Sequence, residues 1–256
     1  MRAIGVHEDV LVLFSRVWQT TCTVVRSGAE GFVIDSPVYP DELELLPALL
    51  EQAGFPCSGL LATHGDWDHL LGRLAFPGAA VGVCETTAAR LAGQLGAPQR
   101  ELRAFDEQHY VDRGGPPLAL GQLEALPVPG YCAIGELELE LHPADGHTDD
   151  GMAVLVPWAG VLVCGDYLSP LEIPLVSGSP AAYLATLGRL EALLERVHTV
   201  VPGHGGVLDA TRARAIARED RAYVELLASG GSPPLPLARA GAEQRRLHAE
   251  NLARRR

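Results

Sequence analysis

Four side chains that commonly bind metal ions lie close together in the segment that follows an apolar run at residues 60–63. They are His64, Asp66, Asp68 and His69. Two carboxylates this close repel each other unless a cation compensates their charge. Imidazole together with carboxylate is a donor set that suits zinc, manganese or iron. The segment therefore predicts a metal site at the end of a buried strand.

Three later turns have the same form, with a donor directly after an apolar strand. His147 lies in a Gly-His-Thr turn, Asp166 in a Gly-Asp turn and His204 in a Gly-His-Gly turn. Ligands of α/β proteins commonly collect outside the ends of strands. We therefore expect these three residues to join the first group in one cluster.

The elements that must position these donors can be predicted from short β-branched runs and from apolar residues at helical spacing. Strands are expected at 10–14, 20–25, 31–34, 60–63, 79–83, 137–142, 152–157, 161–164 and 199–201. Helices are expected between Pro40 and Gly54, at 85–94, at 180–197 and from Asp209 onward. The pattern predicts a mixed α/β protein in which helices cover sheets.

Glycines and prolines divide the rest of the chain. The helical and strand periodicities fade between Gly96 and Gly135, which predicts an insertion or lid at about 96–135. A second run of breakers at 230–236 precedes an Arg-rich segment. We therefore expect a main domain at 1–230 and a helical tail at 231–256.

Composition narrows the class of protein. Of the 256 residues 47% are hydrophobic, which excludes intrinsic disorder, and no apolar run approaches the length of a membrane span. The net charge of −12 argues against a nucleic-acid partner. The first residues lack a secretory signal, and the five cysteines form no C-x-x-C pair. We expect a cytoplasmic protein without a membrane partner.

The donor pattern resembles that of the metallo-β-lactamase superfamily of metal-dependent hydrolases. The family has H-x-H-x-D-H, then a His in a G-H-T turn, an Asp in a G-D turn and a late G-H pair. The matching residues, from a resemblance that runs from Val10 to the helix after His204, are His64, Asp68, His69, His147, Asp166 and His204. Asp35 matches an acidic residue that supports the site from beneath. The resemblance implies a four-layer αβ/βα sandwich.

The resemblance also implies two divalent metal ions, with zinc as the first expectation and manganese or iron as alternatives. It assigns His64 and His147 to the first ion, and Asp166 as a bridge. It assigns Asp68, His69 and His204 to the second ion. Catalysis would rest on a metal-bound hydroxide, with Asp68 handling the proton and Asp166 holding both ions.

Asp66 departs from the family pattern, because the family has a histidine at that position. A carboxylate is shorter than an imidazole, so Asp66 either binds the first ion or acts from outside the ligand shell. If it binds, the additional negative charge makes the site less electrophilic and favours harder ions such as manganese or iron. The metal identity and the number of ions stay open at this point.

The leading functional hypothesis is a hydrolase of a small ester, thioester or lactone. One alternative is a persulfide dioxygenase with a single iron, because the resemblance implies that His64, His147 and Asp166 suffice for it. Another is a ligand-binding protein without catalytic activity. We expect a small-molecule substrate, and an apolar face of the insertion would suit a homodimer.

Several further residues have two interpretations each. Trp67 either walls the site or packs beneath its loop, and Tyr167 either donates to a substrate or stabilises the fold. Asp149 and Asp150 are interpreted as caps of a loop. The basic tail from Arg245 to Arg256 is interpreted as a solvated helix end. His7, His109, His142, His198 and His248 match no position of the family pattern, and only His109, in the insertion, retains interest as part of a lid.

Overall fold

The computed structural model describes residues 1–254, which form two sheets packed face to face. The first sheet contains, in spatial order, β1 (Arg2–His7), β2 (Val10–Phe14), β3 (Thr21–Ser27), β4 (Glu30–Asp35), β5 (Gly59–Leu61), β6 (Val81–Cys84) and β7 (Leu123–Leu126). Strands β1 to β4 pair antiparallel, and β4 to β7 pair parallel.

The second sheet contains, in spatial order, β13 (Leu208–Asp209), β12 (Thr199–Val201), β11 (Val161–Val163), β10 (Met152–Val156), β9 (Leu137–Pro143) and β8 (Gly130–Ile134). Its strands pair antiparallel except β11 and β12, which are parallel. The helices are α1 (Pro40–Ala53), α2 (Gly72–Ala75), α3 (Glu85–Gly93), α4 (Ala97–His109), α5 (Pro180–Leu193), α6 (Ala210–Ala228) and α7 (Ala242–Arg254), with short 3₁₀ turns η1 (Trp67–His69), η2 (Pro157–Ala159) and η3 (Leu237–Arg239).

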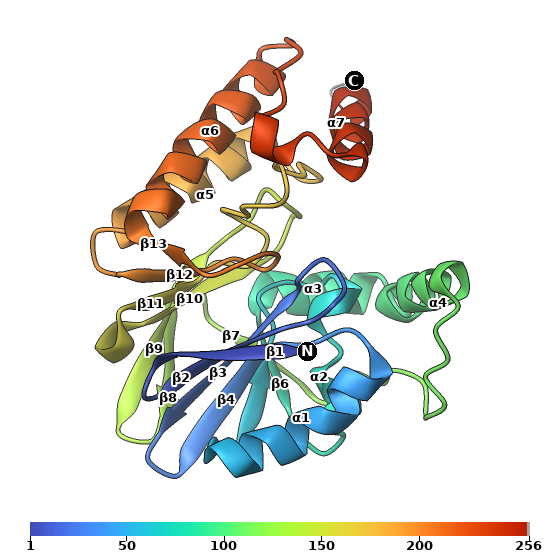
Figure 1. Cartoon of the computed structure of the whole chain (residues 1–256), viewed down its shortest axis with the longest axis vertical. Helices are drawn as coiled ribbons and strands as arrows, with labels where there is room; N and C mark the ends of the chain where they lie inside the picture. Colours follow the sequence, from blue (N-terminus) through green and yellow to red (C-terminus); the bar gives the residue numbers. More distant parts are fainter. Residues whose placement is uncertain (255–256) are drawn as a thin grey trace.

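Successive side chains along each strand point to opposite faces of the sheet, and this alternation produces the four layers. Val12 of β2 and Val154 of β10 lie in the same core cluster between the two sheets. Their neighbours point the other way: Leu13 packs in the cluster that contains residues of α1, and Leu155 packs in the cluster of α5 and α6. A period of two is what a sheet buried on both faces requires. Figure 1 shows α5 and α6 against one sheet and α1 against the other.

The α/β class and the four-layer sandwich are therefore confirmed. Most of the predicted elements occur within a few residues of their expected bounds, and Gly54 ends α1 in a left-handed conformation with a φ of 73°. Strand β1, helix α4 and strands β7 and β8 were not predicted. Among residues 1–254, no helix is long and apolar enough to cross a membrane.

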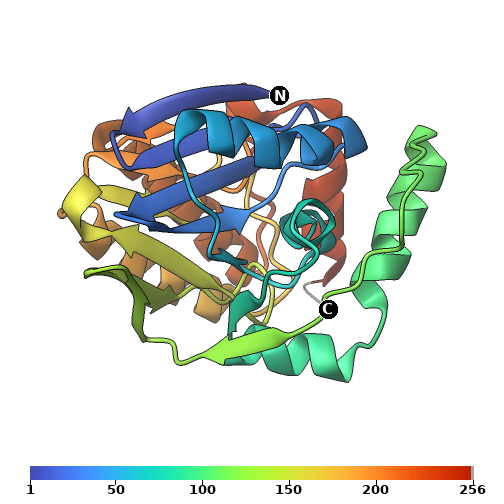
Figure 2. The ribbon, with the colours of Figure 1, turned by 90° about the horizontal axis from the view of Figure 1, so that it is seen from below.

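The range 96–135 is not a single insertion, which corrects the sequence-based expectation. Its second half supplies β7, the edge strand of the first sheet, and β8, the edge strand of the second. Its first half contains α4, whose Leu102 and Phe105 pack against a small cluster at the edge of the sandwich. Figure 2 shows α4 and the chain that follows it, in green, at the side of the molecule.

The C-terminal segment is a helix, α7, that is packed on its inner side. Gln244 accepts a hydrogen bond from the backbone N–H of Ile173, and Asn251 accepts one from that of Val176. Both polar side chains are buried. The helix therefore fixes the chain between β11 and α5. Arg255 and Arg256 of the predicted basic tail lie outside the described residues.

Candidate metal centre

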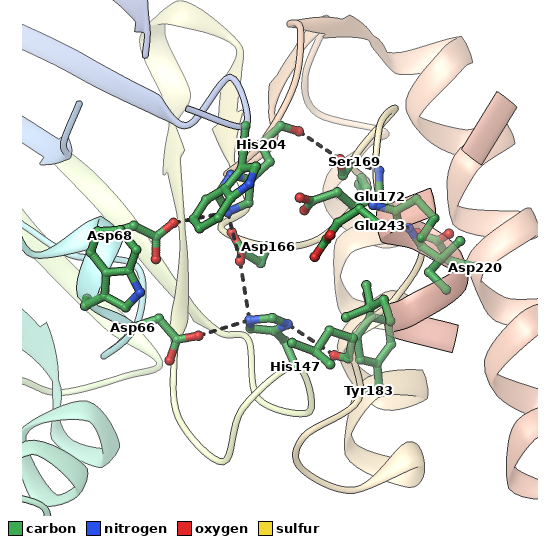
Figure 3. Close-up of a pocket in the computed structure, with 17 residues that line it drawn as sticks. Asp66, Asp68, His147, Asp166, Ser169, Glu172, Tyr183, His204, Asp220 and Glu243 are labelled. Atoms are coloured by element: carbon green, nitrogen blue, oxygen red, sulfur yellow. Dashed lines mark hydrogen bonds and ion pairs between the residues drawn. The ribbon is translucent and has the colours of Figure 1, made fainter. Parts of the chain in front are cut away.

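Loops from both sheets bring the predicted donors to one place. His64 follows β5, and Asp166 and His204 follow the neighbouring strands β11 and β12 of the other sheet. His147 lies in the loop between β9 and β10, while the remaining donors lie in or just before η1. Figure 3 shows Asp66, Asp68, His147, Asp166 and His204 around one centre.

The seven residues predicted as ligands form three overlapping groups. Within each group the donor atoms lie within 4.8 Å of one another. The groups are His64 with Asp66 and His147, His64 with His69 and Asp166, and Asp68 with His69 and His204. The first and last groups share no residue, so the structure provides donors for two adjacent centres. We call His64, Asp66 and His147 the first group, and Asp68, His69 and His204 the second group.

Asp166 lies between these two groups. Its Oδ2 atom is 3.4 Å from Nε2 of His147 in the first group and 3.2 Å from Nε2 of His204 in the second. Its Oδ1 atom is 3.2 Å from Nε2 of His69. One carboxylate thus faces both groups, as a bridging ligand must.

The four imidazoles are held from behind by their Nδ1 atoms. Nδ1 of His147 is 3.1 Å from the carbonyl oxygen of Leu175, which accepts its proton. Nδ1 of His204 is 3.2 Å from Oγ1 of Thr20, and that of His64 is 3.1 Å from Oγ1 of Thr63. Nδ1 of these three histidines faces an oxygen of the protein, and Nδ1 of His69 lies 3.1 Å from Oδ2 of Asp35. Each Nε2 is therefore left to face the metal centre, which is the usual arrangement of metal-binding histidines.

Asp35 supports the second group, as expected from the sequence. Its Oδ2 is 3.1 Å from Nδ1 of His69, and the same carboxylate accepts hydrogen bonds from the backbone N–H and the hydroxyl of Thr63. Asp35 has a φ of 61°, which is unfavourable for a residue other than glycine. The strained residue at the end of β4 therefore links the strand of His64 to His69.

Unsatisfied atoms test whether these residues fit a metal ion. Among residues 1–254, Nε2 of His64, His69 and His147 and Oδ1 of Asp166 are buried and make no hydrogen bond. Buried polar atoms are almost always satisfied, so four such atoms in one place need an explanation. Divalent ions supply one, because all four atoms are good ligands and belong to residues of the three overlapping groups. The donor set fits two metal ions.

A cavity of about 230 Å³ opens beside the two groups. Its lining includes Trp18 and Trp67, whose ring centroids lie 6.0 Å apart, and also Glu172, Glu243 and Gln244. Figure 3 shows the two glutamates directed toward Asp166 across this space. A small molecule in the cavity would therefore contact both the metal donors and α7.

Comparison with known proteins agrees with this geometry. The family model described as the metallo-beta-lactamase superfamily matches residues 15–204, which is most of the chain. The chain belongs to the metallo-beta-lactamase superfamily. A search of the curated proteins found no match.

Solved structures of superfamily members share the fold at low sequence identity. A metallo-beta-lactamase family protein from Thermus thermophilus is 20% identical, with a TM-score of 0.68 over 97% of this chain and 92% of that one. A beta-lactamase domain protein from Burkholderia ambifaria is 19% identical, with a TM-score of 0.68 over 89% and 76%.

An inverting sec-alkylsulfatase from Pseudomonas has a TM-score of 0.71 at 15% identity. The alignment covers 96% of this chain but only 47% of the alkylsulfatase. At these identities the likeness shows the fold alone.

When no metal is bound, the carboxylates of this superfamily member raise the pKa values of His69, His147 and His204. Burial lowers the pKa of His204, but the charges of Asp166, Glu172 and Asp68, together with a hydrogen bond to Asp166, raise that pKa to about 10. Burial likewise lowers the pKa values of His69 and His147, and nearby aspartates raise both above the ordinary value. Burial raises the pKa of Asp166, but the charges of His204 and the other histidines hold it well below the ordinary value.

We expect zinc binding at pH 7 to release more than one proton per chain, because histidines must lose their protons to coordinate. Metal affinity should therefore fall as the pH drops below about 10, where His204 is protonated. The stability of the metal-free fold depends on pH in the opposite direction to the metal affinity. Its stabilisation by protonated His204 is complete below about pH 6.5 and is lost as the pH rises toward 10. Calorimetric titration in buffers of different ionisation enthalpy counts the protons, and release of none would contradict this expectation.

Residues with two interpretations now have defined contacts. Trp67 lies 4.8 Å from Phe105 of α4, ring to ring, and also lines the cavity, so it both packs and walls the site. The hydroxyl of Tyr167 is buried, donates to the carbonyl of Asp145 and accepts from the backbone N–H of His147. Tyr167 is therefore structural, as it fixes the loop of a donor. None of the five histidines outside the family pattern belongs to a donor group of the described residues.

Sequence reasoning missed Arg90 and undervalued Asp150. Arg90, on α3, contacts both Asp66 and Asp150. Asp150 does cap a loop, because it accepts a hydrogen bond from the backbone N–H of Gly65. That loop is the one that carries the donors. No local pattern marks this contact, since Gly65 and Asp150 are 85 residues apart.

Proposed function

We propose that the protein is a metal-dependent hydrolase that cleaves a small ester, thioester or lactone. The observation that carries this proposal is the pair of donor groups joined by Asp166, with buried Nε2 atoms of His64, His69 and His147 that make no hydrogen bond. When bound, two divalent ions would activate a water molecule at neutral pH and polarise the carbonyl of the substrate.

The protein's own residues would orient the reaction. Asp166 would be a ligand of both ions, because its carboxylate faces donors of both groups. Asp68, with its Oδ2 3.4 Å from Nε2 of His204, borders the cavity and is placed to take up a proton during attack. Trp18 and Trp67 would exclude water from one side of the substrate.

The alternative of a single-iron dioxygenase has less support. It needs only three of the donors, His64, His147 and Asp166. The second group, Asp68 with His69 and His204, would then be a buried set of charges without a role. Such a set is costly to keep without a cation. Oxygen uptake with a thiol persulfide is the measurement that would favour this alternative.

The charge of the cavity favours a substrate without a negative charge near the reacting bond. Its lining contains no arginine, and the chain contains no lysine. The carboxylate of Glu172 makes no hydrogen bond or ion pair among residues 1–254, and the charges of His204 and His147 offset its own only in part. Burial raises the pKa of Glu172, which indicates that this charge is poorly solvated. We therefore expect Glu172 to disfavour a substrate that carries an anionic group on its side of the cavity.

Glu172→Gln should therefore raise the hydrolysis of anionic esters relative to neutral esters by about tenfold, since one charge at this range contributes about 1–2 kcal/mol at an effective dielectric constant near 20. The measurement is the ratio of kcat/KM for matched neutral and anionic esters. Glu107→Gln, on the exposed face of α4, is the control and should leave the ratio unchanged. An unchanged ratio in Glu172→Gln would contradict the assigned charge preference.

The test of the proposed function is a panel of neutral esters, thioesters and lactones assayed with zinc-loaded and manganese-loaded protein. We expect hydrolysis that a chelator abolishes and that added metal restores. Absence of turnover across the panel with a protein that holds two ions would count against the proposed reaction.

A further inference from the structure

Asp66 has its two carboxylate oxygens in different surroundings. Oδ2 lies 3.5 Å from Nε2 of His64 and 3.5 Å from Nε2 of His147, so it completes the first group. Oδ1 is turned away from the group and accepts a hydrogen bond of 2.7 Å from Nη2 of Arg90. The carboxylate therefore offers one oxygen to the proposed ion and the other to an arginine.

Arg90 is itself held by a second carboxylate. Its Nη1 donates to Oδ1 of Asp150 at 2.7 Å, while Oδ2 of Asp150 accepts from the backbone N–H of Gly65 and the hydroxyl of Thr87. Asp150 is buried, and the side chain of Arg90 is 22% exposed. A planar guanidinium clamped at both Nη atoms has little freedom to turn.

The loop with the donors packs directly on this pair. A Cβ atom added at Gly65 would lie 3.1 Å from Oδ2 of Asp150 and 3.4 Å from Nη1 of Arg90. Gly65 precedes Asp66, so the backbone approaches the Arg90–Asp150 pair one residue before the carboxylate in question. The position of Asp66 is thus set by backbone and side-chain contacts to the same pair.

We infer that Arg90 is a positioning residue that holds Asp66 as a one-oxygen ligand of the first metal ion. The inference rests on the proposed metal centre. The family pattern has the longer histidine at this position. Here the guanidinium of Arg90, on α3, fixes the shorter aspartate so that it can act as a ligand. Asp150 connects that guanidinium to the loop that carries the donors.

Whether an Arg90 variant binds metal more weakly or more strongly distinguishes a positioning role of Arg90 from an effect of its charge. A positive guanidinium near a metal site opposes cation binding, so removal of the charge alone would strengthen binding. Loss of positioning would weaken it, because outer partners of metal ligands typically contribute about 10- to 100-fold to affinity. Weaker binding in an Arg90 variant therefore reports positioning.

The experiment is a zinc titration of metal-free protein against a chromophoric chelator. For Arg90→Gln we expect one of two zinc equivalents to bind about 10-fold or more weakly, with the other unchanged. The visible spectrum of the cobalt-loaded protein should also change, since the coordination of one ion changes. Arg113→Gln removes a comparable ion pair, with Asp106, and should alter neither readout.

The same substitution in an Asp66→His variant provides a second test, which applies even if Arg90→Gln alone is poorly folded. In Asp66→His the ligand no longer needs the arginine, so adding Arg90→Gln should not weaken zinc binding further. Equal losses in both backgrounds would overturn the inference and leave Arg90 a general stabiliser of the fold. Unchanged zinc binding in Arg90→Gln with two ions in the unmodified protein would overturn it too, while leaving the proposed function intact. Absence of metal from the unmodified protein would overturn both.

Discussion

Asp166→Asn is expected to lose both the metal ions and the hydrolytic activity. The substitution keeps the shape of the side chain but removes the charge that faces His69, His147 and His204 at 3.2–3.4 Å. Because partners outside the ligand shell already contribute about 10- to 100-fold, loss of the ligand that faces both groups should lower kcat/KM by more than about 100-fold.

Metal content by elemental analysis and ester hydrolysis measure the two effects. Asp145→Asn is the matched control, because Asp145 lies near His147 in the chain but pairs with Arg189 away from the centre. It should keep both metal and activity. Full metal content together with full activity in Asp166→Asn would refute the bridging role.

Arg239→Met is expected to have the largest effect on stability. Arg239 is 1% exposed, and its guanidinium donates to Asp220 at 2.6 Å and to the backbone carbonyl of Glu172 at 2.8 Å. It thereby ties the wall of the cavity to α6. Breaking a buried pair by removal of one partner typically costs about 3–5 kcal/mol, because the other charge stays buried.

The loss should depend on pH. Burial raises the pKa of Asp220 to about 7 even with Arg239 present, so a protonated Asp220 tolerates loss of the arginine better than an ionised one. Urea unfolding of Arg239→Met should therefore show a smaller loss at pH 5 than at pH 8. Arg246→Met, at an exposed ion pair of α7, should change the free energy of unfolding by less than about 0.5 kcal/mol. Similar unfolding of the two variants would contradict this account.

Strong local patterns made much of the fold predictable. Strand β2 coincides with the predicted 10–14, and Gly54 ends α1 where expected. Strand β1 was missed because its residues are mostly exposed or half-buried at a sheet edge, so they lack an apolar run. Helix α4 was missed because polar and charged residues dominate it and its apolar contacts come from distant segments.

The donors of the candidate site were predictable for a different reason than its supports. The donors follow strands directly, so their order and spacing are visible in the sequence. Arg90, Trp18 and Glu172 reach the site from a helix and two loops that carry no such pattern. Their roles depend on which segments the two sheets bring together, and this is a property of the tertiary structure.

The metal content of the purified protein decides whether two divalent ions occupy the paired groups joined by Asp166. Elemental analysis of protein purified without added metal or chelator, together with a preparation made without oxygen, measures it most directly. We expect two zinc, manganese or other divalent ions per chain. One iron per chain would favour the dioxygenase alternative, and a protein that holds no metal even after incubation with zinc or manganese would rule out the two-ion centre.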